Sequence, residues 1–374
     1  MRVYFISSDD HYAHRFQVLD DYLKQHGCET TFLTSDFSHM AKATYQCKVP
    51  GCVQIPARPY KKNLSVDRIL SHRNFARDAF AYLEALPEQP DMLIVLLPPN
   101  FLGHYAAQYK RRHPDVKVIL DIFDLWPETF PSPKAKKFLY LPFKVWAAIR
   151  DRSLTWADYV LTECDLFRNR LHLPQEKATT VYLSGKKPKC DTILPRIRED
   201  VLELCYLGSI NNIISIEDIC QLIRQLSAVK PVRLHIIGKG EKQALFREEA
   251  TRAGADVVYY GPIYDDETKM RIMSACRFGL NIMKSSVCIG LTMKSVDYFR
   301  FGLPIINTIP ADTQQLVENC GIGIQWGNDC AERILAMDAD ACCQMRLRVK
   351  AVFDEMFEEE QIKTRYAEVF TRFL

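Results

Sequence analysis

Apolar runs of strand length alternate with amphipathic stretches of helical length along almost the whole chain. In the first half these runs are Val3–Ser7, Thr30–Thr34, Met92–Leu97, Val116–Ile122, Tyr159–Thr162 and Thr179–Leu183. In the second half they are Glu203–Leu207, Arg233–Ile237, Val257–Tyr260, Gly279–Met283, Ile305–Thr308 and Ile322–Trp326. Strands that are apolar on both faces and separated by helices are typical of parallel sheets covered on each side. The pattern therefore predicts an α/β protein with two sheets.

A change of character at residues 184–200 divides the chain. This segment, SGKKPKCDTILPRIRED, is basic, contains proline and lacks periodicity, as an interdomain linker does. We therefore predict an N-terminal Rossmann-like domain at 1–183 and a C-terminal one at 201–357. The helical residues 358–374 are expected to complete the N-terminal domain. Two such halves place a ligand in the cleft between them.

Composition narrows the class of protein. A chain of 374 residues suits two domains, and its 48% hydrophobic and 25% charged residues are those of a globular protein. A net charge of +3 is too small to indicate a nucleic-acid binder. The opening MRVYFISSDD has the pattern of a first strand and not of a signal peptide. The 13 cysteines form no CxxC pair, which favours buried thiols in a reducing cytoplasm over zinc or disulfides.

The segment Cys288–Ile306 carries the strongest chemical signal. Gly290 and Leu291 lead into Thr292, which can cap a helix whose first turn contains Lys294. Such a loop-to-helix junction directs free N–H groups and the positive end of the helix dipole at a diphosphate. Asp297 lies on the same face as Lys294 and can accept the hydroxyls of a ribose. The alternative is a capped core helix with a surface Lys–Asp pair.

Three further segments are expected at the same edge of the second sheet. Cys205–Ile210 ends a strand in Gly208 and Ser209, Ile236–Lys242 turns at Lys239, and Tyr259–Tyr264 includes Ile263. Each alone is more often an ordinary strand-to-helix turn. The turn around Lys239 lacks the third glycine of a dinucleotide fingerprint, so we expect no nicotinamide or flavin cofactor.

In the first half, DIFDLWPETF (Asp121–Phe130) places a carboxylate at the end of a strand. Asp124 is expected to face the ligand, with Trp126 as an apolar wall beside it. The alternative is a turn-capping aspartate. Arg15 and His72 are expected on the acceptor side of the same region.

The stretch Lys134–Arg152, KAKKFLYLPFKVWAAIRDR, mixes basic and large apolar residues. That composition is typical of an amphipathic segment lying on an anionic membrane surface. A helix packed on the N-terminal domain with its lysine head groups in water explains it equally well.

Taken in order, these segments resemble a known family. YLGSI, IIGKGEK, YYGPI and GLTMKSVDYFRFGLPII resemble the donor-binding domain of glycosyltransferase family 4, retaining enzymes of the GT-B fold. DIFDLWPETF resembles the DLWPE segment of polysaccharide-assembling members. NLSVDRILSHRNFARD (Asn63–Asp78) is similar to the N-terminal domain of capsular-polysaccharide transferases.

The resemblance implies a function and a set of roles. Asp297 would hold the donor ribose, Gly290–Lys294 would face the diphosphate, and Asp124 would lie at the mouth of the active site. The implied activity is metal-independent, retaining transfer of a hexosyl group from a nucleotide sugar, expected to be UDP-linked. The acceptor would be a glycan or a lipid-linked molecule in the synthesis of a bacterial surface polysaccharide. We expect this at the cytoplasmic face of the membrane, with no metal and no nucleic acid.

The chain departs from the family pattern at two places. The first of the family's two acids would fall at Ile289, and no cation follows Gly208 in Ser209–Ile213. Diphosphate charge would then rest on Lys294, with Lys239 or Lys284, and on backbone N–H groups. Two other functions remain open, a nucleotide-sugar epimerase and a non-catalytic partner of a transferase that binds a nucleotide sugar or glycan.

Overall fold

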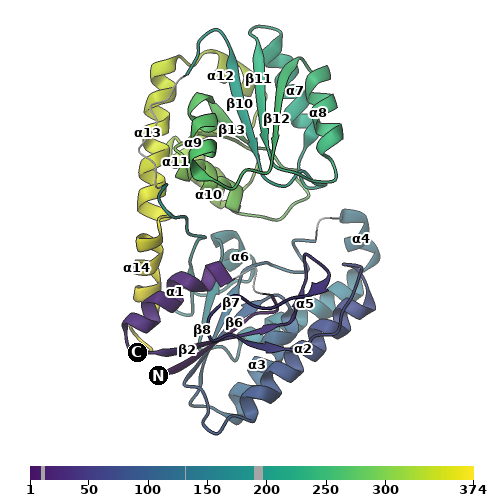
Figure 1. The fold of residues 1–374 in the computed structure, drawn as a ribbon, viewed down its shortest axis with the longest axis vertical. Helices are drawn as coiled ribbons and strands as arrows, with labels where there is room; N and C mark the ends of the chain where they lie inside the picture. The colour runs from purple at the N-terminus through teal and green to yellow at the C-terminus, as the bar shows by residue number, and fades with distance from the viewer. Residues whose placement is uncertain (10–12, 131, 189–196) are drawn as a thin grey trace. The chain divides into compact units, whose positions relative to one another are not determined.

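The computed structural model describes residues 1–9, 13–130, 132–188 and 197–374. The chain forms two compact units: unit 1 is Met1–Tyr182 together with Ile362–Leu374, and unit 2 is Leu183–Gln361 (Figure 1). The crossing into unit 2 at Leu183 adjoins the expected linker at 184–200, of which residues 189–196 lie outside the described part. The chain returns to unit 1 within the C-terminal helical stretch.

Unit 1 is built on a seven-stranded sheet in which every neighbouring pair is parallel. Its order is β5-β2-β1-β6-β7-β8-β9. The strands are β1 (Arg2–Ile6), β2 (Glu29–Ser35), β5 (Val53–Ile55), β6 (Met92–Leu97), β7 (Lys117–Ile122), β8 (Tyr159–Thr162) and β9 (Ala178–Thr180). A short antiparallel pair, β3 (Phe37–Ser38) and β4 (Ala43–Thr44), lies outside this sheet. β6 is buried at all its positions, as expected for a strand covered on both faces.

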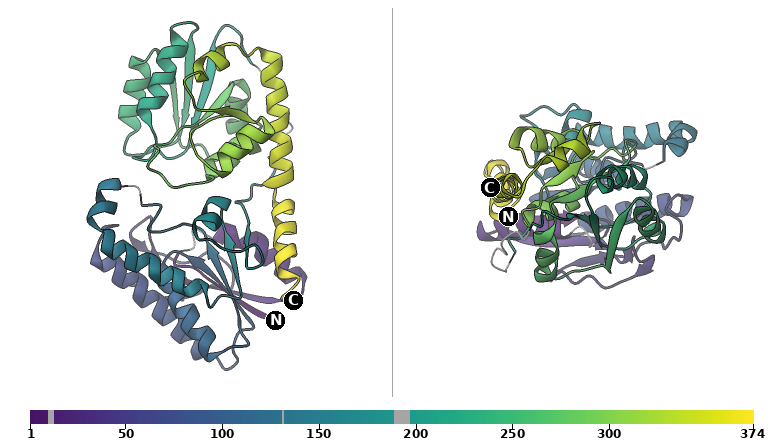
Figure 2. Two further views of the ribbon diagram at one scale, coloured as in Figure 1. Left: turned by 180° about the vertical axis from the view of Figure 1, so that it is seen from behind. Right: turned by 90° about the horizontal axis from the view of Figure 1, so that it is seen from above.

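Helices cover both faces of this sheet (Figure 1; Figure 2). One apolar core contains residues of α2 (Val66–Glu84) and α3 (Asn100–Arg112), with α5 (Tyr140–Leu154) packed beside α3. A second core, on the opposite face, contains residues of α1 (Ala13–Gln25) and α14 (Glu359–Phe370). The short helices α4 (Pro133–Phe138) and α6 (Asp165–Arg170) complete the unit. The C-terminal helix is thus part of the core of unit 1.

Unit 2 repeats this architecture with a six-stranded parallel sheet in the order β12-β11-β10-β13-β14-β15. Its strands are β10 (Leu202–Leu207), β11 (Val232–Ile237), β12 (Ala255–Gly261), β13 (Phe278–Asn281), β14 (Ile305–Asn307) and β15 (Gly323–Gln325). Its helices are α7 (Ile216–Ser227), α8 (Gln243–Arg252), α9 (Asp266–Ala275), α10 (Met293–Arg300), α11 (Asp312–Cys320), α12 (Cys330–Leu335) and α13 (Ala339–Met356). α7, α8 and α12 share one apolar core with the sheet.

A buried ion pair joins α1 to the centre of the unit 1 sheet. Arg15 donates from Nε and Nη2 to the two carboxylate oxygens of Asp121 at 2.7 and 2.8 Å, and from Nη1 to the carbonyl of Val181 at 3.0 Å. Both side chains are 1% exposed. The sequence predicted Arg15 on the acceptor side. The structure places its guanidinium instead in the core, where a bidentate carboxylate satisfies its charge.

We expect Arg15→Ala to lower the free energy of unfolding of unit 1 by about 3–5 kcal/mol, because it leaves Asp121 buried without its partner. Urea unfolding followed by tryptophan fluorescence measures this. Lys24→Ala, which removes an exposed partner of Asp20, serves as the control and should change the value by less than about 1 kcal/mol. Equal, small effects of both substitutions would show that the Arg15 pair does not stabilise the unit.

Candidate functional site

A cavity of about 420 Å³ opens at the carboxyl-terminal edge of the unit 1 sheet. Its walls come from the loops after β1, β2, β6 and β7, from α2, and from the loop before α2. Because these strands are parallel, their carboxyl ends meet at one edge, which is where α/β proteins bind ligands. The lining residues are Ser8, Asp9, Ser35, Phe37, His39, Ala57, Tyr60, Asn63, Leu64, Arg68, Ser71, His72, Phe75, Pro98, Pro99, Asp124, Trp126 and Phe130. The predicted Asp124, Trp126 and His72 are therefore brought together.

Asp124 is the carboxylate of this cavity whose environment is most perturbed. Its backbone N–H donates to the carbonyl of Leu97 at 3.3 Å, which ties the loop after β7 to the end of β6. The Thr129 hydroxyl donates to Oδ1 at 2.5 Å, and the Trp126 side chain also donates to the carboxylate. Burial nevertheless raises the pKa of Asp124 to about 6, since it disfavours the charged form more than these bonds favour it.

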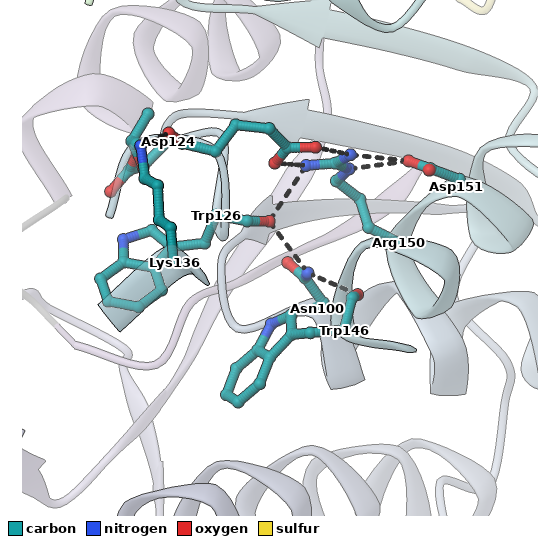
Figure 3. Close-up of polar contacts among 9 residues, drawn as sticks. Asn100, Asp124, Trp126, Lys136, Trp146, Arg150 and Asp151 are labelled. Carbon is teal, nitrogen blue, oxygen red and sulfur yellow. Dashed lines mark hydrogen bonds and ion pairs between the residues drawn. The ribbon is translucent and has the colours of Figure 1, made fainter. Parts of the chain in front are cut away.

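The loop that carries Asp124 is held in place by polar contacts with α3 and α5 (Figure 3). The carbonyl oxygen of Trp126 accepts from Asn100 Nδ2 at 3.2 Å and from Arg150 Nη1 at 3.0 Å. Arg150 also binds both carboxylate oxygens of Glu128 at 2.7 and 2.9 Å. Glu128 therefore holds the loop in place through Arg150.

Two basic side chains of α2 face Trp126 and Asp124. The Arg68 guanidinium lies over the Trp126 ring, 5.2 Å from its centroid, and donates to the carbonyl of Asn63 at 3.0 Å. His72 Nδ1 is buried and has no hydrogen-bond partner among the described residues. Burial, followed by the nearby charge of Arg68, holds the pKa of His72 well below its usual value. The imidazole is thus neutral at pH 7 and able to exchange hydrogen bonds with a ligand.

The remaining wall of the cavity was missed by sequence reasoning. His39 Nδ1 lies 2.5 Å from the Tyr60 hydroxyl, and the backbone N–H of His39 donates to Asp9 Oδ2 at 2.7 Å. His39 and Tyr60 come from a region of short strands and turns with no apolar periodicity. The single available signal was the position of Asp9 directly after the first strand.

In unit 2, the loops after β10 and β11 pack backbone against backbone. A Cβ atom on Gly238 would lie 1.9 Å from the carbonyl oxygen of Gly208, and one on Gly240 would lie 2.2 Å from that of Ile210. Gly208 and Gly238 have φ values of +117° and +146°, which favour glycine. The predicted Gly208, Ser209 and Lys239 lie on these loops, with the side chains of the last two exposed. Ile263 lies on the loop after β12, at the same edge of the sheet.

The start of α10 is fixed by a network of buried polar groups. Thr292 caps the helix, since its hydroxyl accepts from the N–H of Ser295 at 3.1 Å. The Ser295 hydroxyl in turn accepts from Asn281 Nδ2 at 3.0 Å. The carbonyl of Gly290 accepts from the N–H and the hydroxyl of Thr313 at 3.0 and 2.6 Å. Leu291 is buried beneath this junction. The predicted capped helix is therefore present, and its N-terminus is held rigidly.

Lys294 projects from the first turn of α10 toward the loop after β10. Its ammonium lies 4.8 Å from the centroid of the Tyr206 ring, and its Cδ is 3.8 Å from the position of a Cβ on Gly208. Among the described residues it has no carboxylate partner. Burial lowers the pKa of Lys294 to about 7. A group of negative charge bound at this helix end would stabilise the protonated lysine and meet the free N–H groups of the first turn.

Asp297 lies one turn further along α10 and is partly buried. Its carboxylate accepts no hydrogen bond within the described part of the chain, and burial raises its pKa despite the charges of Lys269 and Arg300. It forms no ion pair with Lys294 there, so the alternative of a surface Lys–Asp pair is not what the structure contains. Ile289, where the family pattern has its first acid, lines a separate cavity of about 240 Å³.

The basic stretch Lys134–Arg152 forms α4 and α5. Four of its large apolar side chains are exposed: Phe138, Tyr140, Leu141 and Val145. Lys137 and Lys144 are exposed beside them, whereas Phe143 turns inward and packs on Phe130 with 5.2 Å between ring centroids. No helix in the described part of the chain has the length and apolar character to cross a membrane.

The described residues contain no group of three or more His, Cys, Asp or Glu side chains arranged to hold a metal ion. What the two candidate regions offer is therefore hydrogen-bonding groups, cationic side chains and apolar walls. In unit 1 these are a carboxyl group with a raised pKa and a neutral imidazole inside a cavity. In unit 2 they are a helix N-terminus and an ammonium with a lowered pKa.

We expect Asp124→Asn to stabilise the protein by about 1–2 kcal/mol at pH 7.5. The pKa of Asp124 is raised from 3.8 to about 6 on folding, so stability is lost as the pH rises between these values. The difference between wild type and variant should vanish near pH 4, where the folded carboxyl is protonated. Thermal unfolding at both pH values measures it, with the exposed Asp115→Asn as control. A variant less stable than wild type at pH 7.5 would contradict this.

Comparison with solved structures identifies the fold. The sequence matches no protein-family model and no curated protein sequence. The apo form of the lipopolysaccharide outer core galactosyltransferase WaaB matches with a TM-score of 0.69 at 13% identity over 100% of both chains. Anabaena HepE in complex with UDP and glucose matches with 0.68 at 14% over 100% of both chains. WaaG, a glycosyltransferase involved in lipopolysaccharide biosynthesis, matches with 0.59 at 11%, covering 98% of this chain and 99% of its own. The two Rossmann-like units thus form a GT-B fold.

Proposed function

We propose that the protein is a glycosyltransferase that moves a hexosyl group from a nucleotide sugar to a glycan or lipid-linked acceptor in the synthesis of a surface polysaccharide. The observation that carries the proposal is the ammonium of Lys294, held at the N-terminus of α10 over Tyr206 with no carboxylate partner among the described residues. A structural lysine is normally exposed or paired. A diphosphate supplies the missing charge, and the HepE structures with UDP support a UDP-linked donor.

On the donor side, bond cleavage leaves negative charge on the diphosphate. The first-turn N–H groups of α10 and the Lys294 ammonium are fixed before the reaction, so they stabilise this charge without reorganising. Asp297, whose carboxylate is free to accept hydrogen bonds, is assigned to the ribose hydroxyls. Gly208 has no side chain, so the backbone after β10 leaves space for the donor to approach Lys294. No step in this scheme uses a metal ion. Retention of the anomeric configuration is part of the proposal through the family resemblance.

On the acceptor side, the unit 1 cavity is assigned to the molecule that receives the sugar. Aromatic walls such as Trp126 and Tyr60 fit the apolar faces of a sugar ring, and His72 and Asp124 offer hydrogen bonds to its hydroxyl groups. A carboxyl group whose pKa is about 6 is largely ionised at pH 7.5 and still close enough to neutrality to exchange a proton. Asp124 therefore orients the attacking hydroxyl and accepts its proton as the new bond forms.

The exposed apolar surface of α4 and α5 is assigned to the cytoplasmic face of a membrane. Phe138, Tyr140, Leu141 and Val145 can enter the interface, with Lys137 and its neighbour Lys144 over anionic head groups. The aromatic contacts from Phe143 to Phe130 and from Phe130 to Trp126 connect this surface to the wall of the acceptor cavity. This continuity supports a lipid-linked acceptor over a free glycan.

We expect Lys294→Ala to lower kcat for nucleoside diphosphate release by about 10²–10³-fold, because it removes charge stabilisation of the leaving group. A panel of UDP-, GDP- and dTDP-sugars with membrane lipid extract as acceptor source measures the rate. Lys187→Ala, an exposed lysine of the same unit, is the matched control and should keep the wild-type rate.

Unchanged turnover in Lys294→Ala would overturn the assignment. Binding of a nucleotide sugar without release, even with acceptor present, would instead favour the non-catalytic partner. The observation that favours this second candidate is Ile289 in place of an acid.

We expect the wild-type protein to sediment with vesicles that contain phosphatidylglycerol and far less with pure phosphatidylcholine. Substituting Phe138→Glu and Leu141→Glu together should reduce binding to anionic vesicles by about tenfold or more, since both burial and charge are lost. The same change of charge at exposed positions of unit 2, Val229→Glu with Leu347→Glu, is the control. Equal binding of both double variants would rule out α4 and α5 as the membrane surface.

A further inference from the structure

The cavity beside Ile289 is formed by the loops after β13 and β14 and has a volume of about 240 Å³. Five of its eight lining residues are apolar: Met283, Val287, Ile289, Ile309 and Pro310. An apolar cavity of about 150 Å³ is enough to bind benzene. The space beside Ile289 therefore accommodates a pyranose ring or a large part of one.

On the side of the cavity formed by Thr308 and Ile309, polar groups already form hydrogen bonds within the protein. The Thr308 hydroxyl accepts from the N–H of Met283 at 2.7 Å and donates to its carbonyl at 3.0 Å. The N–H of Ile309 donates to Asn307 Oδ1 at 3.2 Å, and its carbonyl accepts from Asn307 Nδ2 at 2.7 Å. A sugar hydroxyl placed against the apolar side chains of Val287, Ile289 and Ile309 would lose water without gaining a hydrogen bond, which is costly. A methyl group placed there gains from leaving water.

The cavity adjoins the proposed diphosphate site along the chain. Ile289 precedes Gly290, whose carbonyl is fixed by Thr313, and the cap of α10 follows at Thr292. The loop that forms the cavity wall thus continues directly into the helix start assigned to the diphosphate. In a nucleotide sugar the sugar is bonded to that diphosphate, so this cavity is where part of the sugar would lie. Lys284 and Ser285, both exposed, leave a polar rim for the hydroxyls at the other side of the ring.

Resting on the proposed function, we infer that this cavity holds a methyl-bearing substituent of the donor sugar, so that the donor is an N-acetylated or 6-deoxygenated nucleotide sugar and not an unsubstituted hexose. In both cases the group in contact with Ile289, Val287 and Ile309 is a methyl group. An acid at position 289 would bind a hydroxyl at the same place, and isoleucine exchanges that hydrogen bond for apolar contact.

The test compares donors that differ at a single position of the sugar. Calorimetry on the full-length protein gives Kd values for UDP, UDP-glucose, UDP-N-acetylglucosamine and UDP-6-deoxyglucose, with UDP-galactose and UDP-N-acetylgalactosamine as the matching pair of the other series. We expect one methyl-bearing donor to bind about tenfold or more tightly than its unsubstituted counterpart. The pair that shows the difference identifies the acetyl or the deoxy form.

Ile289→Gln should abolish the preference for the methyl-bearing donor. Glutamine is similar in size to isoleucine, but its amide forms hydrogen bonds with hydroxyl groups. Val229→Gln, the same kind of change at an exposed position of unit 2, should keep the preference. Wild-type affinity for UDP in each variant shows that the unit is folded. Equal affinities within each pair, or tightest binding of the unsubstituted sugar, would overturn the inference while leaving UDP binding intact. If GDP or dTDP binds in place of UDP, the same pairs are compared as sugars of that nucleotide. Failure of all three nucleoside diphosphates to bind would overturn the proposed function.

Discussion

Parallel pairing of neighbouring strands is the constraint on which both candidate regions depend. It brings the carboxyl ends of β1, β2, β6 and β7 to one edge of unit 1, and those of β10, β11 and β13 to one edge of unit 2. Side chains that are distant in sequence therefore lie near one another at each edge, even where they do not contact each other directly. The loops that carry them are held by bonds to the sheet and its helices, such as the N–H of Asp124 to Leu97 and the carbonyl of Trp126 to Arg150. The sheet thus sets the positions of these loops, and the side chains on the loops supply the chemically active groups.

The titratable side chains at these edges have few partners that offset the cost of burying their charged forms. Burial lowers the pKa values of Lys294 and His72 and raises that of Asp124, so each is held in surroundings that oppose its charge. By contrast Arg15, which is more deeply buried, meets a bidentate carboxylate from Asp121. The paired charge of Arg15 stabilises the fold, whereas the groups without such a partner are those assigned to ligands in the proposed function. A ligand of opposite charge would offset the cost of burying Lys294 in its charged form.

Local signals explain what could be predicted from sequence. The apolar run at Met92–Leu97 and the capping threonine at 292 act within a few residues, and the structure contains both as expected. The partner of Arg15 could not be foreseen, since Asp121 lies 106 residues away and nothing near either residue marks the pair. His39 was missed for a related reason. It lies between the two-residue strands β3 and β4, which are too short to show alternation, and its contact with Tyr60 joins residues that are 21 positions apart.

The isoleucine at position 289 shows how a structure changes the meaning of a missing residue. From sequence alone it is an absent acid, and absence suggests lost activity. In the fold it is one side of an apolar cavity whose neighbouring polar groups are satisfied. In the proposed function, the charge that develops on a leaving diphosphate is stabilised at the start of α10 and by Lys294, without an acid at position 289. Within that proposal, Ile289 bears on which sugar fits, whereas Lys294 bears on how its bond breaks.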